Sequence, residues 1–229
     1  YAIFSWASAL RSRDPQTFAL TWGSPAFLCT ILGYGTVAFI SYATSYWGAP
    51  YGERVFEISK SELGLLLGAP AAVTGFLGVI AGGRMADWLF TKLPGGRLYV
   101  VLFGLLAPVP VVWVMFTTDS KALFLVLAAV AQLFASSALG AAAATSQSLV
   151  LPRMRGVATA TFFLATTLVG LALGPYLAGL VSSKADGDLG LGMLSTLWVA
   201  PIGLVLLVAA LKLVPAAQER VLAAGQSEA

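Results

Sequence analysis

The chain has 229 residues, of which 59% are hydrophobic and only 10% are charged, and its mean hydropathy is +0.88. Soluble domains carry about 25% charged residues, so this composition indicates an integral membrane protein. The absence of histidine excludes a Ser-His nucleophile and a His-ligated metal. Because Cys29 is the single cysteine, an intrachain disulfide is also excluded. The net charge of +3 comes from loops rather than from a nucleic-acid-binding face.

Six charge-free stretches are each long enough to cross a bilayer, which takes about 20 apolar residues. We predict transmembrane helices over 26–47, 62–83, 98–118, 122–149, 156–181 and 193–213. The predicted organisation is a cytoplasmic linker over residues 1–24, a six-helix transmembrane bundle over 25–214 and a cytoplasmic tail over 215–229.

Basic residues gather in the loops on one side of these spans. That side holds nine cations: Arg11, Arg13, Arg84, Lys92, Arg97, Arg153, Arg155, Lys212 and Arg220. The other side holds four: Arg54, Lys60, Lys121 and Lys184. Because cytoplasmic loops carry the excess of Lys and Arg, we predict that both termini lie in the cytoplasm.

Small residues recur along one face of the second and the fifth predicted helix. They are Gly64, Gly68, Gly75, Gly78 and Gly82 in the second helix, and Gly170 and Gly174, before Pro175, in the fifth. Small residues at this spacing let helix backbones approach closely in lipid, so we expect them to be helix-packing positions. The third and sixth helices are apolar throughout and are expected to form lipid-facing outer walls.

Polar side chains are concentrated in the first and fourth predicted helices. The first helix has Tyr34, Ser41, Tyr42 and Ser45, and the fourth has Gln132, Ser136, Ser146 and Gln147. Polar groups at bilayer depth are costly unless they bond to other helices or face a wet cavity. Interhelical hydrogen bonding and cavity lining both remain open, and the similar position of the two helices in each triplet favours a substrate cavity.

The loop after the second predicted helix resembles a known signature. Residues 82–87 read Gly-Gly-Arg-Met-Ala-Asp, and Gly96-Arg97 follows. This resembles the Gly-x-x-x-Asp-(Arg/Lys)-x-Gly-(Arg/Lys) loop of the major facilitator superfamily, although Trp88 replaces the first basic residue and the Gly-Arg pair comes several residues late. Residues 152–158 and 170–179 resemble the eleventh helix of the spinster-like branch, and Trp47, Pro50 and Arg54 resemble the end of its seventh helix.

This resemblance implies that the six spans are helices seven to twelve, the C-terminal half of a transporter built as a 3+3 inverted repeat. It implies alternating access, a lysophospholipid or sphingosine-1-phosphate-like lipid as substrate, proton coupling through the N-terminal half, and a bacterial inner or plasma membrane. It also implies a cytoplasmic gate, for which the matching residues are Asp87, Arg84, Arg97 and Arg155. Asp87 would bond to the N-terminus of a helix in the other half; the alternative is a solvated salt bridge from Asp87 to Arg84 or Arg97.

Other functions remain open at this stage. A proton-coupled transporter of drugs or small metabolites from the same superfamily is the main alternative, and a self-contained six-span channel is an alternative of another class. An enzyme is not expected, because the chain has neither histidine nor a Gly-x-Ser-x-Gly motif. The sequence predicts no cofactor and no metal.

Overall fold

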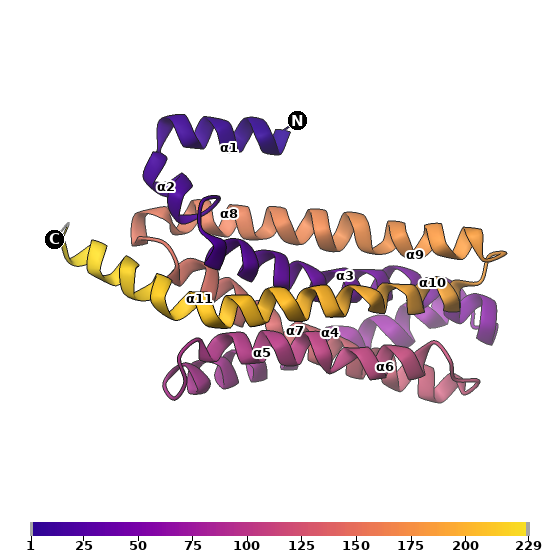
Figure 1. Cartoon of the computed structure of the whole chain (residues 1–229). Coiled ribbons are helices and arrows are strands. Elements are labelled where there is room, and N and C mark those ends of the chain that lie inside the picture. Colours follow the sequence, from indigo (N-terminus) through magenta and orange to yellow (C-terminus); the bar gives the residue numbers. More distant parts are fainter. Residues whose placement is uncertain (1, 228–229) are drawn as a thin grey trace.

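The structure is a computed structural model that describes residues 2–227, in which every regular element is a helix (Figure 1). The elements are α1 (Ala2–Arg13), α2 (Pro15–Leu20), α3 (Pro25–Phe56), α4 (Lys60–Phe90), α5 (Gly96–Leu106), α6 (Pro108–Met115), α7 (Lys121–Ser148), η1 (Pro152–Met154), α8 (Arg155–Ala165), η2 (Thr166–Ala172), α9 (Leu173–Lys184), α10 (Leu189–Ser195), η3 (Thr196–Val199) and α11 (Ala200–Ser227). Within the described range, six helical segments are long and apolar enough to cross a membrane. The prediction of an all-α protein with six spans is confirmed.

Capping side chains fix where the spans begin. The hydroxyl of Ser24 accepts a hydrogen bond from the Phe27 N–H directly before α3. Ser59 and Glu62 form a reciprocal capping box at the start of α4. The N–H groups of a first helical turn have no intrahelical partner, so these side chains satisfy them and separate each span from the turn before it. Both helices run on beyond the predicted apolar stretches, to Phe56 and Phe90.

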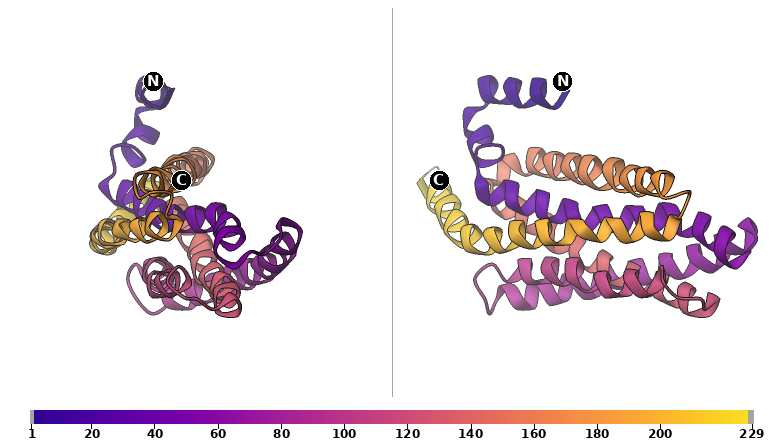
Figure 2. Two further views of the ribbon diagram at one scale, coloured as in Figure 1. Left: turned by 90° about the vertical axis from the view of Figure 1, so that its right-hand side faces the viewer. Right: turned by 45° about the vertical axis from the view of Figure 1, so that its right-hand side comes forward.

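The loops divide between two ends of the bundle. One end, here called the basic end, holds the start of α3, the turn around Lys92 and the turn that contains Arg153. The opposite end, here called the hairpin end, holds the α3–α4 turn at residues 57–59, and this hairpin projects beyond the neighbouring helices (Figure 2).

Helix α3 lies among the other helices and is buried along most of its first half. The fifth span, α8–η2–α9, packs against it through two glycines. A Cβ atom at Gly174 would lie 2.5 Å from the Phe39 carbonyl oxygen, and one at Gly170 would lie 2.6 Å from the Ala38 Cβ. Only glycine allows the two backbones to come this close.

The fifth span also contains a π-helical segment, η2, directly before Gly174 and Pro175. Proline has no N–H to donate to the carbonyl four residues earlier, and its ring crowds that carbonyl. A wider turn ahead of Pro175 accommodates both effects, as at other π-bulges. The helix therefore widens ahead of Gly174 and Pro175, and the span continues through them.

The α4–α7 pair is the second close contact between backbones. A Cβ atom at Gly78 would lie 2.4 Å from the Leu133 carbonyl oxygen, and one at Gly82 would lie 2.1 Å from the Ser137 carbonyl oxygen. At Gly75 the nearest atom, Nε2 of Gln132, would be at an ordinary 3.6 Å. The tightest contact is thus at the basic end of α4.

The third span differs from its expected role as a lipid-facing wall. It breaks at Ala107 into α5 and α6, and it buries Val101, Leu105, Val112 and Met115 while exposing Trp113 and other apolar residues on its opposite face. Hydropathy alone could not separate these faces, because both are apolar. In the sixth span, Trp198 and Val205 are largely exposed, as expected for a lipid-facing wall.

The two terminal segments are helical. The predicted linker over 1–24 contains α1 and α2, and α1 lies apart from the bundle (Figures 1 and 2). The predicted tail over 215–229 continues α11 through Pro215 as far as Ser227, and the Gln218 side chain donates a 2.7 Å hydrogen bond to the Ser148 hydroxyl. Residue 1 of the linker and residues 228–229 of the tail lie outside the described residues.

Candidate substrate cavity

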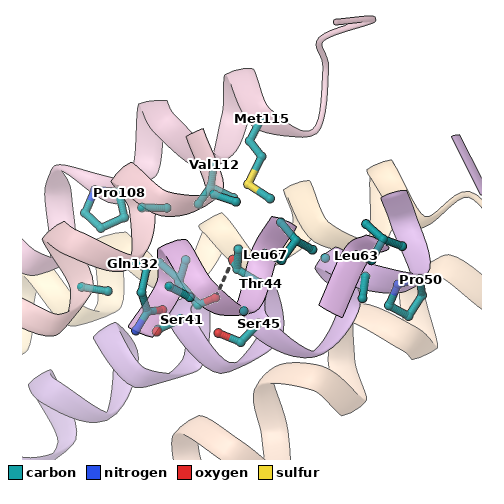
Figure 3. A pocket seen from close by; sticks show the side chains of 18 of the residues that line it. Ser41, Thr44, Ser45, Pro50, Leu63, Leu67, Pro108, Val112, Met115 and Gln132 are labelled. Atoms are coloured by element: carbon teal, nitrogen blue, oxygen red, sulfur yellow. Dashed lines mark hydrogen bonds between the residues drawn. The ribbon is translucent and has the colours of Figure 1, made fainter. Parts of the chain in front are cut away.

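A cavity of about 600 Å³ lies inside the bundle, between α3, α4, α5, α6 and α7 (Figure 3). Sites for small molecules in proteins usually measure about 300–1,000 Å³ and are mostly apolar with a few polar groups. The size of this cavity therefore suits a small organic ligand.

The lining is mostly hydrocarbon. Leu63 of α4, Leu105 of α5 and Val112 and Met115 of α6 are buried side chains on its wall. Its polar neutral side chains are Ser41, Thr44 and Ser45 of α3 and Gln132 of α7. Figure 3 shows the α3 hydroxyls and Gln132 on the side of the cavity away from Val112 and Met115. One wall is therefore polar and the other apolar.

Two of these polar groups already have partners. The Thr44 hydroxyl donates to the Ile40 carbonyl at 2.8 Å, and Nε2 of Gln132 donates to the Ser136 hydroxyl at 3.0 Å. Ser41 and Ser45 have no hydrogen-bond partner among the described residues. Their hydroxyls can therefore each donate a hydrogen bond to a ligand and accept one from it.

The cavity exists because α4 diverges from its neighbours toward the hairpin end. A Cβ atom at Gly64 or at Gly68 would have no neighbouring atom within 4 Å, and both residues line the cavity. The glycine stripe expected to pack along its whole length thus packs tightly at Gly78 and Gly82 and borders open space at Gly64 and Gly68.

Two prolines also shape the walls. Pro50 lies within α3, and Pro108 begins α6 after the break in the third span; both line the cavity. Proline removes a backbone hydrogen bond and bends or interrupts a helix. The two helices can therefore bend around a space instead of closing it.

The charged residues of the lining, Glu53 and Lys60, lie at the hairpin end. The Lys60 Nζ atom is 3.6 Å from the Glu53 carboxylate, and the two side chains are 82% and 47% exposed. Exposed ion pairs contribute about 0–1 kcal/mol, so this pair can open at little cost. The cavity thus has a charged opening and an uncharged interior.

The predicted cavity residues fall into two groups. Ser41, Ser45 and Gln132 line the cavity, and Ser136 bonds to Gln132 behind it. The other four lie elsewhere. Tyr34 is buried and stacked on Phe162, with the ring centroids 5.1 Å apart, and Tyr42 is exposed beside Gly170. The Ser146 hydroxyl donates a hydrogen bond to the Ala143 carbonyl, and the Gln147 side chain donates one to the Thr159 hydroxyl. 

Depth along the helix separates Tyr34, Ser146 and Gln147 from the cavity, whereas Tyr42 lies at the depth of Ser41 and Ser45 but on another face of α3, beside Gly170. Tyr34 is only about 20° from Ser41 around α3, but it lies about 10 Å further along the axis. Gln147 is about 22 Å from Gln132 along α7 by the same measure. At those depths, the fifth span fills the space beside both helices, through Phe162 and Thr159.

The residues matching the gate signature lie at the basic end without gathering into one cluster. The Arg97 guanidinium is 3.3 Å from the Asp87 carboxylate and also stands over the Phe90 ring, 4.1 Å from its centroid. Arg84 and Arg155 are exposed and form no ion pair with any described residue. Asp87, in the last turn of α4, thus pairs with Arg97 in the first turn of α5.

Sequence reasoning missed the apolar wall of the cavity. Leu63, Leu67, Val112 and Met115 belong to helices that had been expected to pack or to face lipid. Pro50 and Pro108, inside otherwise regular spans, could have indicated that these helices bend around this wall. Among the described residues, no group of three or more Cys, Asp or Glu side chains is placed to hold a metal ion.

Comparison with known proteins identifies the kind of molecule to which this chain is similar. An MFS-type efflux pump of Mycolicibacterium smegmatis is 29% identical over 192 residues, which are 84% of this chain and 43% of the pump. Human spinster homolog 3 is 28% identical over 171 residues, 69% of this chain and 33% of that protein. No family model matches the chain.

The fold is shared with a solved structure. A crystal structure of a bacterial homologue of the human lysosomal transporter spinster, inward-facing and unoccupied, superimposes with a TM-score of 0.66 at 23% identity, covering 93% of this chain and 52% of that one. The chain thus spans between a third and about half of the proteins it matches. The predicted resemblance is confirmed: the chain is similar to an MFS-type efflux pump and to spinster proteins, over a length that corresponds to between a third and about half of each.

Proposed function

We propose that this chain is the C-terminal half of a secondary transporter that moves an amphipathic lipid across the bilayer by alternating access. The lipid is of the lysophospholipid or sphingosine-1-phosphate kind. The observation that carries the proposal is the cavity itself, whose hydrocarbon lining is combined with the free hydroxyls of Ser41 and Ser45 and with a charged opening. An amphipathic molecule presents the same combination of surfaces.

Two exposed apolar faces support the assignment to one half of a transporter. Leu65 and Phe76 of α4 are 70% and 66% exposed, and Phe163 and Tyr176 of the fifth span are also largely exposed. Halves of major facilitator transporters move largely as rigid bodies around a central site. We propose that the N-terminal half covers these faces and that the cavity opens toward it.

The proposed orientation places the basic end in the cytoplasm, because cationic loops stay on that side. A cysteine introduced in place of Ser59, at the hairpin end, should react with an impermeant thiol reagent added outside cells, and a cysteine in place of Lys92 should not. Cys29 is replaced first in both proteins. Reversed labelling would overturn this orientation.

Proton coupling is proposed to reside in the N-terminal half. The charged residues of the cavity lining are the exposed pair Glu53 and Lys60, and neither lies in the apolar interior. Intramembrane carboxylates are the usual proton-coupling groups of transporters, and the cavity interior contains no carboxylate among its lining residues.

Efflux of drugs or small metabolites is a second candidate, favoured by the similarity to the M. smegmatis efflux pump. The two candidates differ in the ligand that the cavity must hold. An elongated lipid chain would use the whole apolar wall, whereas a compact cationic drug would need a carboxylate in the cavity interior.

The test uses the complete natural polypeptide in proteoliposomes, with a pH gradient imposed across the membrane. Uptake of a fluorescent lysophospholipid is compared with that of a cationic dye, and Gln132→Trp, which should fill the cavity, serves as the inactive control. We expect saturable, gradient-dependent lipid movement that Gln132→Trp abolishes. Dye movement without lipid movement would favour the efflux candidate. Non-saturable solute flux would favour a channel.

A further inference from the structure

The wall that α4 contributes to the cavity contains glycines that have no packing role in the structure. Cavity-lining residues of α4 are Lys60, Leu63, Gly64, Leu67, Gly68 and Ala71, which follow one face of the helix. The glycines at positions 64 and 68 would each give a Cβ atom no neighbour within 4 Å. This distinguishes them from Gly78 and Gly82, whose Cβ atoms would collide with the backbone of α7.

Glycine inside a helix costs up to about 1 kcal/mol relative to alanine. At Gly78 and Gly82 the close approach of α7 accounts for this cost. At Gly64 and Gly68 no atom of the described residues lies within 4 Å of the missing Cβ, and both glycines border the open volume of the cavity. Their effect is therefore on what the cavity can contain.

The shape of the cavity indicates the class of occupant. From Lys60 to Ala71 the lining face of α4 covers about 16 Å of helix axis. The charges of Glu53 and Lys60 lie at one end of the cavity, and neutral, mostly apolar residues line the rest. A ligand with a polar end and a hydrocarbon chain matches this order of charged and apolar surfaces.

We propose that Gly64 and Gly68 determine the length and bulk of the hydrocarbon chain that the cavity accepts, with the polar end of the ligand beside Glu53 and Lys60. This inference rests on the proposed function, since it takes an amphipathic ligand as given. The two glycines act as specificity-determining positions: a larger side chain at either one would occupy the space of part of the chain while leaving the helix contacts intact.

The expected loss of binding affinity can be worked out per methylene group of the ligand chain. Burying one methylene group contributes about 0.8 kcal/mol, so each methylene that no longer fits weakens binding about four-fold. A leucine at position 68 that excludes two or three methylenes should therefore weaken binding of a long-chain ligand about 15- to 60-fold. A short-chain ligand that does not reach position 68 should keep its affinity within about two-fold.

The experiment measures Kd for short-, medium- and long-chain members of one lysophospholipid series on the complete natural polypeptide in detergent. The variants are Gly64→Leu, Gly68→Leu and, as matched control, Gly83→Leu, since Gly83 is on the same helix, has open space at its Cβ and does not line the cavity. Should a leucine variant fail to fold, Gly68→Ala and Gly64→Ala should give a smaller shift in the same direction.

A shift of preference toward shorter chains in the position 64 and 68 variants, absent from Gly83→Leu, is the expected result. Equal weakening at all chain lengths, or unchanged Kd values, would overturn the assignment. A different result would refute the proposed function alone. If the natural protein binds the lysophospholipid series in a chain-length-dependent way but does not move these lipids across vesicle membranes, transport is refuted and this inference stands.

Discussion

Among the glycines of α4, Gly82 makes the closest contact with the backbone of α7. A Cβ atom there would lie 2.1 Å from the carbonyl oxygen and 2.5 Å from the Cα atom of Ser137, both backbone atoms that no side-chain rotation can move. Gly82→Ala therefore requires α4 and α7 to separate by about 1 Å or more to restore ordinary contact distances. Gly83, the next residue, has open space at its Cβ.

The two substitutions should change stability in opposite directions. Overpacking usually costs about 1–3 kcal/mol, and replacing a helical glycine by alanine returns up to about 1 kcal/mol. Gly82→Ala should therefore lose about 1–2 kcal/mol net, while Gly83→Ala should gain about 0.4–1 kcal/mol. For a domain of this size these values correspond to a fall in Tm of about 2–8 °C and to a rise of up to about 4 °C.

The assay is thermal unfolding of both proteins in the same detergent, followed by far-ultraviolet circular dichroism. Because the two substitutions have the same chemistry at adjacent positions, detergent and helix-propensity effects are shared. If Gly82→Ala unfolds at the same temperature as Gly83→Ala, α4 and α7 do not approach as closely as the structure places them, and the account of the α4–α7 contact is refuted.

Three further results are expected. Trp47→Phe removes the 2.8 Å hydrogen bond from the indole N–H to the Pro175 carbonyl, and should lower the unfolding free energy by about 0.5–1.5 kcal/mol in the same thermal assay; an unchanged Tm would contradict the contact. Asp87→Asn should lower the free energy of unfolding by less than about 1 kcal/mol, because the carboxylate of the ion pair with Arg97 is exposed. It should also leave the distances between spin labels on the two halves unchanged, and a shift in those distances would show that Asp87 latches the halves together. Gln132→Leu should weaken lipid binding about five-fold, the value of one hydrogen bond of about 1 kcal/mol, and an unchanged Kd would remove this residue from the site.

The number and approximate limits of the spans can be read from the amino-acid pattern, because a bilayer requires long apolar helices and because serine and proline residues end or begin them. The sequence also indicated the transporter relationship, since the loop around Asp87 has residues in a recognisable order. It determined which α3 and α7 side chains share an angular position, because the α-helical repeat fixes that angle.

The depth of each side chain along the bundle and the residues around it follow from how the helices pack together. The glycines of α4 form one stripe in sequence, yet Gly82 touches a backbone and Gly68 borders open space. Ser41 and Tyr34 share a face of α3, yet one lines the cavity and the other is stacked on Phe162. In both pairs the helical repeat sets the direction of the side chain, whereas the divergence and bending of neighbouring helices set what lies in that direction, and those depend on packing between residues far apart in the chain.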